Sequence, residues 1–209
     1  MEKRDRMKNI SIKAFFYIMG LVIISLGITL TIKSDLGAGA WDAVNVGLTE
    51  TVGLTVGTWV MIIGAVLILT NALIAKEKPD LLAVITILII GQFIDFWMLS
   101  VFDSFGVVHF WLQFTVLIGG IAIIAVGVSL YLQPKFSLNP VDGFMVALQK
   151  RFGFSLTTAK TLTEAFALIL ALVLGGPIGI GTVIILLLIG PFIQFFDGKA
   201  NYVMNKMLS

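Results

Sequence analysis

Six apolar stretches divide this 209-residue chain, and each is long enough to cross a lipid bilayer as a helix. A bilayer core needs about 20 apolar residues per helix. Hydrophobic residues make up 58% of the chain and charged residues 12%, whereas soluble domains have roughly 45–50% and about 25%. We therefore expect one all-α membrane domain, with spans at residues 14–31, 54–75, 81–102, 113–132, 155–174 and 178–196.

The positions of lysine and arginine predict how these spans are oriented. With six spans, the two tails and the loops after the second and fourth spans lie on one side of the membrane. Of the 14 Lys and Arg residues, all but Lys33 and Lys160 fall on that side. Basic residues concentrate in cytoplasmic loops. We expect a multi-pass protein of the cytoplasmic membrane whose tails, 1–13 and 197–209, are both cytoplasmic.

The two halves of the chain resemble each other at an offset of about one hundred residues. Asp42 matches Asp142, and the run 90–96 matches 189–195 after a shift of one residue. Because each half holds three spans, an odd number, the second half enters the membrane from the opposite side. We therefore expect two inverted repeats of three spans, an arrangement found in many secondary transporters. The repeats cover about 14–102 and 113–196, and each has a helical connector after its first span.

The connectors are too polar to span the membrane, and each is expected to contain a short helix. Asn139 suits a helix cap and Pro140 the first helical position. In the first connector, Gly37 and Gly39 precede a similar but weaker helix start.

Asp42 and Asp142 lie in the first turns of these connector helices, and two interpretations remain open. In one, the helices lie at the membrane interface and the two aspartates cap free N–H groups. In the other, they enter the membrane as half-helices whose N-termini face an anionic ligand.

These stretches resemble a known family. The first half reads LGAGAWD at 36–42 and GLTVGTW at 53–59, and the second reads PVDG at 140–143 and GGPIGIGT at 175–182. The runs are similar to those of the YczE/YitT-type bacterial integral membrane proteins, more narrowly the YczE branch. This chain departs from the family pattern at Ala40, where proline is usual. The resemblance implies a cytoplasmic-membrane protein and supplies no substrate.

Ionisable residues inside spans are costly and point to function. Glu164 lies ten residues into the fifth span, about 15 Å deep, and Lys160 precedes it by one helical turn. The two form either a structural ion pair or a proton- or substrate-coupling site. Asp95, about 12 Å inside the third span, is interpreted first as a hydrogen-bonding position between helices. Small residues recur every four positions through the fifth span, which predicts a central, closely packed helix.

These features favour a small secondary transporter or permease of unknown substrate over two alternatives. The alternatives are a membrane partner of a biosynthetic or signalling complex, and a substrate-binding subunit of an ATP-driven importer. The chain has no cysteine and one histidine, which argues against a metal site. No catalytic constellation or nucleotide motif is present, so we expect no enzyme activity, no cofactor and no nucleic-acid partner. The expected partners are the bilayer and a small molecule or ion, and a homo-oligomer remains open.

The inverted arrangement predicts the sidedness of the two connectors. Cysteine at Glu50 should react with an impermeant thiol reagent from outside the cell, and cysteine at Lys150 only after the cytoplasmic side is exposed. Because the chain has no native cysteine, the reagent can label only the introduced thiol of this protein. Labelling of both positions from the same side would contradict inverted halves.

Overall fold

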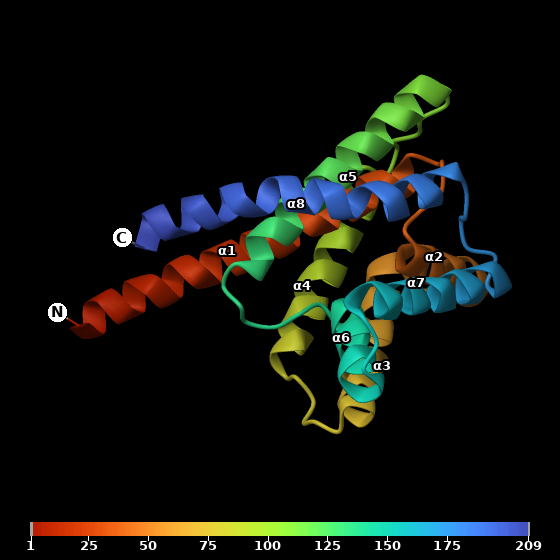
Figure 1. Cartoon of the computed structure of the whole chain (residues 1–209). Helices are drawn as coiled ribbons and strands as arrows, with labels where there is room; N and C mark the ends of the chain where they lie inside the picture. Colours follow the sequence, from red (N-terminus) through yellow and green to blue (C-terminus); the bar gives the residue numbers. More distant parts are fainter. Residues whose placement is uncertain (1, 209) are drawn as a thin grey trace.

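The computed structural model describes the backbone of residues 2–208 and the side chains of residues 7–208. Within that range the chain is helical and contains no strand, and six helices are long and apolar enough to cross a membrane. The elements are α1 (Glu2–Lys33), α2 (Ala40–Val52), α3 (Val56–Ala75), α4 (Leu82–Phe96) with the π-helical turn η1 (Trp97–Val101), α5 (Phe110–Leu132), α6 (Pro140–Phe152), α7 (Leu156–Val173) and α8 (Ile180–Leu208) (Figure 1).

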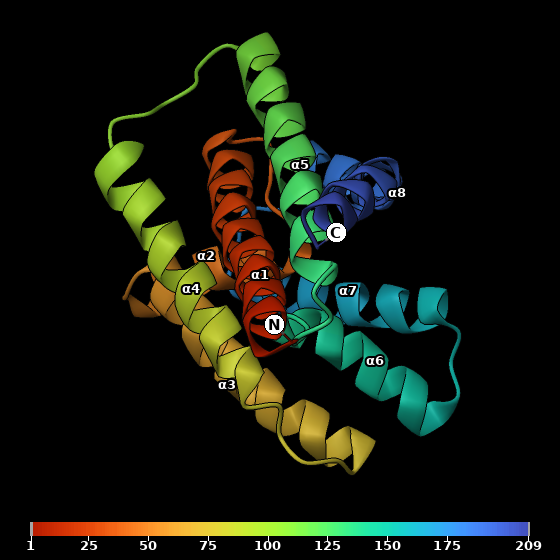
Figure 2. The same ribbon diagram turned by 90° about the vertical axis from the view of Figure 1, so that its left-hand side faces the viewer.

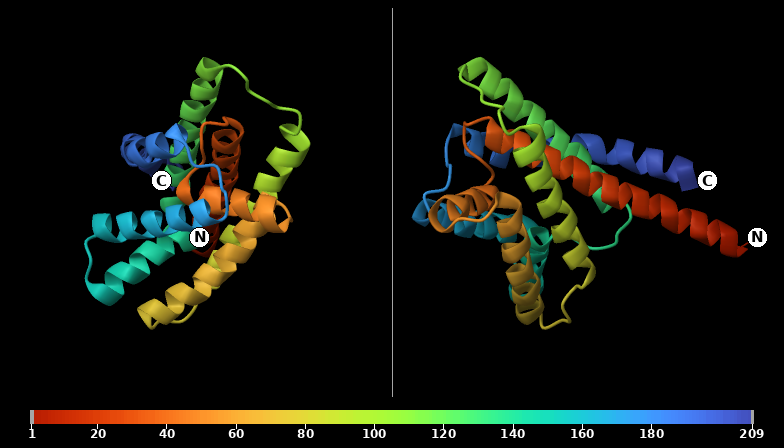
Figure 3. Two further views of the ribbon diagram at one scale, coloured as in Figure 1. Left: turned by 90° about the vertical axis from the view of Figure 1, so that its right-hand side faces the viewer. Right: turned by 180° about the vertical axis from the view of Figure 1, so that it is seen from behind.

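The six predicted spans correspond to α1, α3, α4 with η1, α5, α7 and α8, and the two predicted connector helices are α2 and α6. The difference lies at the tails, because α1 and α8 run on through both predicted tails as regular helix. Both termini lie at the same end of the molecule (Figures 1 and 3), as an even number of spans requires.

Helix α1 lies between α4 and α5 and also contacts α8 (Figure 2). Its closest neighbour is α5, and glycines make the close approach of the two backbones possible. A Cβ atom on Gly20 would lie 2.7 Å from the carbonyl oxygen of Gly127, and one on Gly27 would lie 2.8 Å from that of Gly120. Side chains at these four positions would therefore push the two helices apart.

Each connector helix packs against a span from the other half of the chain. Helix α2 lies along α7, and α6 lies along α3. The packing of α2 on α7 buries Ala40, Ala43 and Val44 of α2 against Ala167 and Ala171 of α7. We refer to this crossing of each connector to the other half as the exchange of connectors. The two halves are thus joined by the α1–α5 contact and by both connectors.

Helix α7 is less central than the small-residue pattern predicts. Its stripe of small residues is buried, as expected, and consists of Ala159, Thr163, Ala167 and Ala171. Its opposite face is exposed and apolar, as at Ile169 and Leu172. One face of α7 therefore holds the connectors while the other is free to contact lipid.

The glycine contact between α1 and α5 generates a stability prediction with a matched control. Gly127→Ala should lower the stability of the purified protein by about 1–3 kcal/mol, because the new methyl group overlaps the backbone of α1. Gly119→Ala on the same helix meets no atom within 4 Å. It should be neutral or slightly stabilising, because alanine is the better helix former. Equal melting temperatures for the two variants would contradict this packing.

Candidate functional site

The two connector helices begin differently, and only one start is capped by a side chain. The Asn139 side chain accepts a hydrogen bond from the Val141 N–H at 3.4 Å, with Pro140 at the first helical position, as predicted. At α2 the cap residue is Gly39, which has no side chain to offer. Asp42 does not replace it, because no hydrogen bond joins its carboxylate to an N–H group of the described chain.

Gly37 joins the two halves of the chain. It has a φ of 109°, which favours glycine, and a Cβ atom there would lie 2.6 Å from the Gly179 nitrogen. On either side of it, Ala38 N–H donates to Pro177 O at 2.9 Å and Gly181 N–H donates to Leu36 O at 2.7 Å. The loop before α2 is therefore fixed against the loop before α8.

The exchanged connectors bring four of the predicted site residues into one neighbourhood. Asp42 comes from α2, Asp142 from α6, and Lys160 and Glu164 from α7. Asp42 lies close enough to Glu164 for their charges to interact, and Lys160 lies close enough to both Asp142 and Glu164. We call these four residues the charged cluster.

Lys160 does not form the direct ion pair with Glu164 that the sequence suggested. It contacts neither Glu164 nor Asp142 at ion-pair distance, although the structure describes all three side chains. Its ammonium group thus interacts with two carboxyl groups across a gap. With three carboxyl groups and one ammonium group, the charged cluster carries an excess of negative charge when it is fully ionised.

The two aspartates of the charged cluster have different environments. Asp142 accepts a hydrogen bond from the Tyr131 hydroxyl at 2.7 Å, and it does not cap α6 as one interpretation expected. Burial raises the pKa of Asp142, while the bond from Tyr131 and the charge of Lys160 oppose that rise. Asp42 lacks such partners. Burial raises the pKa of Asp42 to about 7, and the nearby Glu164 carboxylate adds to the rise.

Asp42 lines a small cavity between the two halves, with a volume of about 50 Å³. Trp41, Asn45 and Asn139 supply the other polar groups of its wall, and apolar residues of α1, α3, α4 and α6 supply the rest. The Trp41 Nε1 and Asn45 Oδ1 atoms are buried without a hydrogen-bond partner. Buried polar atoms are nearly always satisfied, so two unpartnered ones on residues that line the same cavity make it a candidate binding site.

Sequence reasoning singled out Asp42 but missed Trp41, Asn45 and Tyr131 as site residues. Asn45 lies three residues after Asp42, on the same face of a helix. A search for polar residues at helical spacing from Asp42 would have found it. Tyr131 had no comparable signal, because its contact with Asp142 depends on how the loop after α5 turns.

Asp95 lies outside the charged cluster and stabilises the start of α3. Its carboxylate accepts hydrogen bonds from the Thr55 hydroxyl at 2.5 Å and the Gly57 N–H at 2.8 Å. This agrees with the first interpretation of Asp95, a hydrogen-bonding position between helices.

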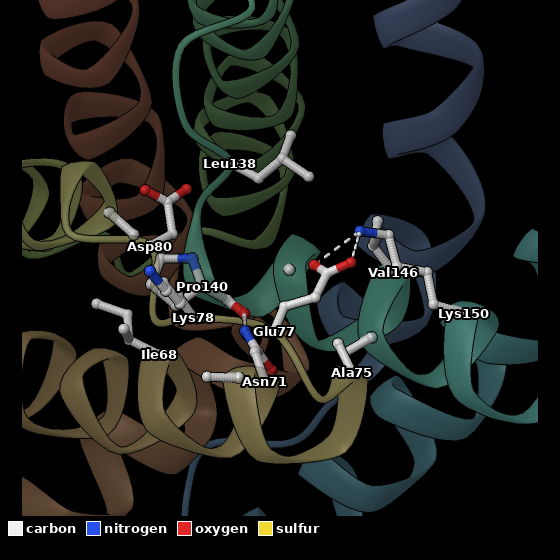
Figure 4. A pocket seen from close by; sticks show the side chains of 14 residues that line it. Ile68, Asn71, Ala75, Glu77, Lys78, Asp80, Leu138, Pro140, Val146 and Lys150 are labelled. Atoms are coloured by element: carbon white, nitrogen blue, oxygen red, sulfur yellow. Dashed lines mark hydrogen bonds and ion pairs between the residues drawn. The ribbon is translucent and has the colours of Figure 1, made fainter.

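A second cavity of about 140 Å³ lies between α6 and the end of α3 (Figure 4). On its wall, Asn71 Nδ2 donates to Pro140 O at 2.8 Å, and Lys150 Nζ forms an ion pair with Glu77 at 2.9 Å. Asp80 accepts a hydrogen bond from Ser137 at 2.8 Å nearby. These contacts hold the loop after α3 against the second connector, at one end of the molecule.

The raised pKa of Asp42 predicts a pH dependence of stability. The folded chain holds this proton more tightly than the unfolded chain, so stability is greatest below the ordinary aspartate pKa and falls as pH rises toward 7. Asp42→Asn should flatten the decline in melting temperature between about pH 4 and 7. Asp35→Asn, at an exposed position, serves as the control and should keep the wild-type profile. Parallel profiles for Asp42→Asn and wild type would contradict the burial of this carboxyl group.

Comparison with known proteins confirms the resemblance seen in the sequence. Residues 11–198 match the model of a family of unknown function, DUF6198. The uncharacterized protein YyaS of Bacillus subtilis is 37% identical over 88% of this chain and 92% of its own length. The uncharacterized membrane protein YczE of the same organism is 32% identical over 91% and 87% of the two chains. An uncharacterized protein of Haemophilus influenzae is 29% identical over 90% and 83%. No solved structure matches. The chain belongs to the DUF6198 family, and its relatives include the membrane protein YczE.

Proposed function

We propose that this protein is a small secondary transporter of the cytoplasmic membrane, in which a polar solute crosses along the interface of two inverted halves. The observation that carries the proposal is the charged cluster beside a cavity whose wall holds unpartnered polar atoms. Both lie where helices from the two halves meet. Ionisable groups among apolar helices are costly and are typical of solute and proton pathways.

The contacts between α1 and α5 support inverted halves. Gly20 and Gly27 of α1 are separated from Gly120 and Gly127 of α5 by the same hundred residues that relate Asp42 to Asp142. Gly20 packs against Gly127 and Gly27 against Gly120, so each helix presents equivalent positions to the other in reverse order. This reciprocity is what a two-fold axis between the halves produces.

The exchange of connectors supports the same symmetry. Helix α2 of the first half packs on α7, the second span of the second half, while α6 packs on α3, the second span of the first half. In inverted-repeat transporters the solute site lies at the interface of the repeats. The charged cluster, with members from α2, α6 and α7, occupies such a position.

The distribution of charge supports cytoplasmic termini. The loop after α3 and the second connector are joined by the Lys150–Glu77 ion pair and the Ser137–Asp80 hydrogen bond. Both segments belong to the side that carries most of the lysine and arginine residues. Basic loops favour the cytoplasm, so we assign this side and both termini to it.

Purified protein in sealed vesicles, with a pH-sensitive dye inside, tests the transport proposal. Addition of amines, amino acids, carboxylates and inorganic ions in turn should reveal a solute that changes the internal pH with wild-type protein. Glu164→Gln should lose this signal while its melting temperature stays close to that of wild type, because the variant removes a titratable group from the charged cluster. Glu50→Gln, at an exposed position on α2, should behave as wild type.

The transport proposal fails if Glu164→Gln retains the full signal or if no solute gives a signal. In the second case, co-purification with one stoichiometric soluble protein would favour a membrane partner of a complex. Co-purification with an ATPase would favour a subunit of an importer.

A further inference from the structure

We infer that Trp41, Asp42 and Asn45 form a binding site for the ammonium and hydroxyl groups of a small amino alcohol. This inference deepens the transport proposal, on which it rests, by naming the class of solute.

The three residues lie within one turn and a half of α2 and line the same cavity. The Asp42 carboxylate has no hydrogen-bond partner in the described part of the chain. Asn45 Oδ1 is a buried acceptor without a donor, and Trp41 Nε1 is a buried donor without an acceptor. Interchanging the two amide atoms of Asn45 would still leave a buried polar atom unpartnered. The residues that line the cavity therefore carry acceptor oxygens on Asp42 and Asn45 and an indole N–H donor on Trp41, none of which has a hydrogen-bond partner in the described chain.

The charge of the site selects a cation. The three carboxyl groups of Asp42, Asp142 and Glu164 outnumber the single ammonium group of Lys160. Asp42 lies near the carboxyl group of Glu164 and forms no ion pair with a described lysine or arginine side chain. An anionic ligand would be repelled by these carboxylates. A ligand ammonium group can donate to both Asp42 and Asn45, because it carries three N–H donors.

A metal ion fits the site less well than an ammonium group. Across residues 7–208, no three acidic or histidine side chains are gathered closely enough to coordinate an ion. The indole N–H of Trp41 is also a donor, and a bare cation cannot accept a hydrogen bond from it.

The Trp41 N–H instead needs an oxygen on the ligand. A hydroxyl group near the ammonium group can accept that hydrogen bond. The cavity volume of about 50 Å³ limits the ligand to a few non-hydrogen atoms, because a water molecule needs about 10–15 Å³ on this scale. Ethanolamine, with one nitrogen, two carbons and one oxygen, has the required groups and size.

The aromatic neighbours of Trp41 hold its ring in place. The indole ring packs edge-on against Phe144 at a centroid distance of 6.1 Å and also contacts Phe166 at 6.3 Å. Phe144 belongs to α6 and Phe166 to α7, so the indole ring of Trp41 on α2 is packed against side chains of two other helices. Trp41→Phe keeps a ring in this cluster and removes only the donor, which makes it an informative variant.

Calorimetric titration of the detergent-purified protein with ethanolamine tests the inference without any transport step. Ethanolamine should bind more tightly than ethylamine, which lacks the hydroxyl group. Choline lacks N–H donors, 1,2-ethanediol lacks the charge and glycolate carries the opposite charge, so none of the three should bind comparably. Asp42→Asn should weaken ethanolamine binding about 10- to 100-fold. Asp35→Asn should leave it unchanged.

Trp41→Phe separates a contact with the ligand from a structural role. It should weaken ethanolamine binding about threefold to tenfold and leave ethylamine binding nearly unchanged, because only ethanolamine can accept from the indole N–H. Equal loss for both amines would assign Trp41 to packing and overturn its part in the site. This variant also provides a test if Asp42→Asn fails to fold.

Binding should also weaken as pH falls below about 7, where Asp42 takes up a proton. Among the charged groups, Glu164 of α7 lies close enough to Asp42 to act on its charge. Glu164 in turn interacts with Lys160 of α7 and with Asp142 of α6, and the Asp142 carboxylate is held by Tyr131 of α5. Glu164→Gln removes one neighbouring charge and should shift the pH midpoint of binding downward.

The inference is overturned if no amine binds, if Asp42→Asn binds ethanolamine as tightly as wild type, or if the neutral and anionic analogues bind equally well. In the first case water fills the cavity. Amine binding without flux in vesicles would keep this site and remove the transport proposal. Flux of another solute without amine binding would keep transport and remove the amino-alcohol class.

Discussion

Where α1 and α5 cross, four glycines let the two backbones touch, and the arrangement of the two halves depends on that contact. Association of helices in lipid gains little from the hydrophobic effect, so close backbone packing is the main source of attraction. Gly20 and Gly27 on one helix and Gly120 and Gly127 on the other provide it. With α1 and α5 fixed, α4 and α8 pack around them, and the connectors reach across to the opposite half.

The packing of each connector against the opposite half buries carboxyl groups, which is unfavourable for stability, and it also assembles the charged cluster. Packing α2 on α7 buries small side chains efficiently, but it also carries Asp42 into the neighbourhood of Glu164. A structure selected for stability alone would replace such groups, because neither carboxylate has a direct ion-pair partner. Asp95 offers the contrast, since its two hydrogen bonds to the start of α3 account fully for a structural acid.

The cavity beside α6 and the cavity beside Asp42 are both lined by residues of the two halves. The larger one opens beside the Lys150–Glu77 ion pair, where exposed charges and the loop after α3 meet α6 (Figure 4). The smaller one is lined by apolar side chains of three spans and by the polar face of α2. Pro140 O, which accepts from Asn71 on the wall of the larger cavity, lies directly after Asn139 on the wall of the smaller one. The first turn of α6 therefore separates the two.

The sequence by itself determined the six long helices, the two connector helices and the capped start of α6. These follow from local rules, namely the length of apolar stretches and the fit of Asn139 and Pro140 to a helix start. It also identified Lys160 and Glu164, because ionisable residues within a span are rare, and Asp42 and Asp142, because they occupy matching positions in the two connectors. Only the tertiary structure decided that Asp42 lies near Glu164, that Lys160 pairs directly with neither nearby acid, and that Trp41 and Asn45 line a cavity. These outcomes depend on which helix faces pack together across the chain, and the spacing of residues along a single helix does not encode that choice.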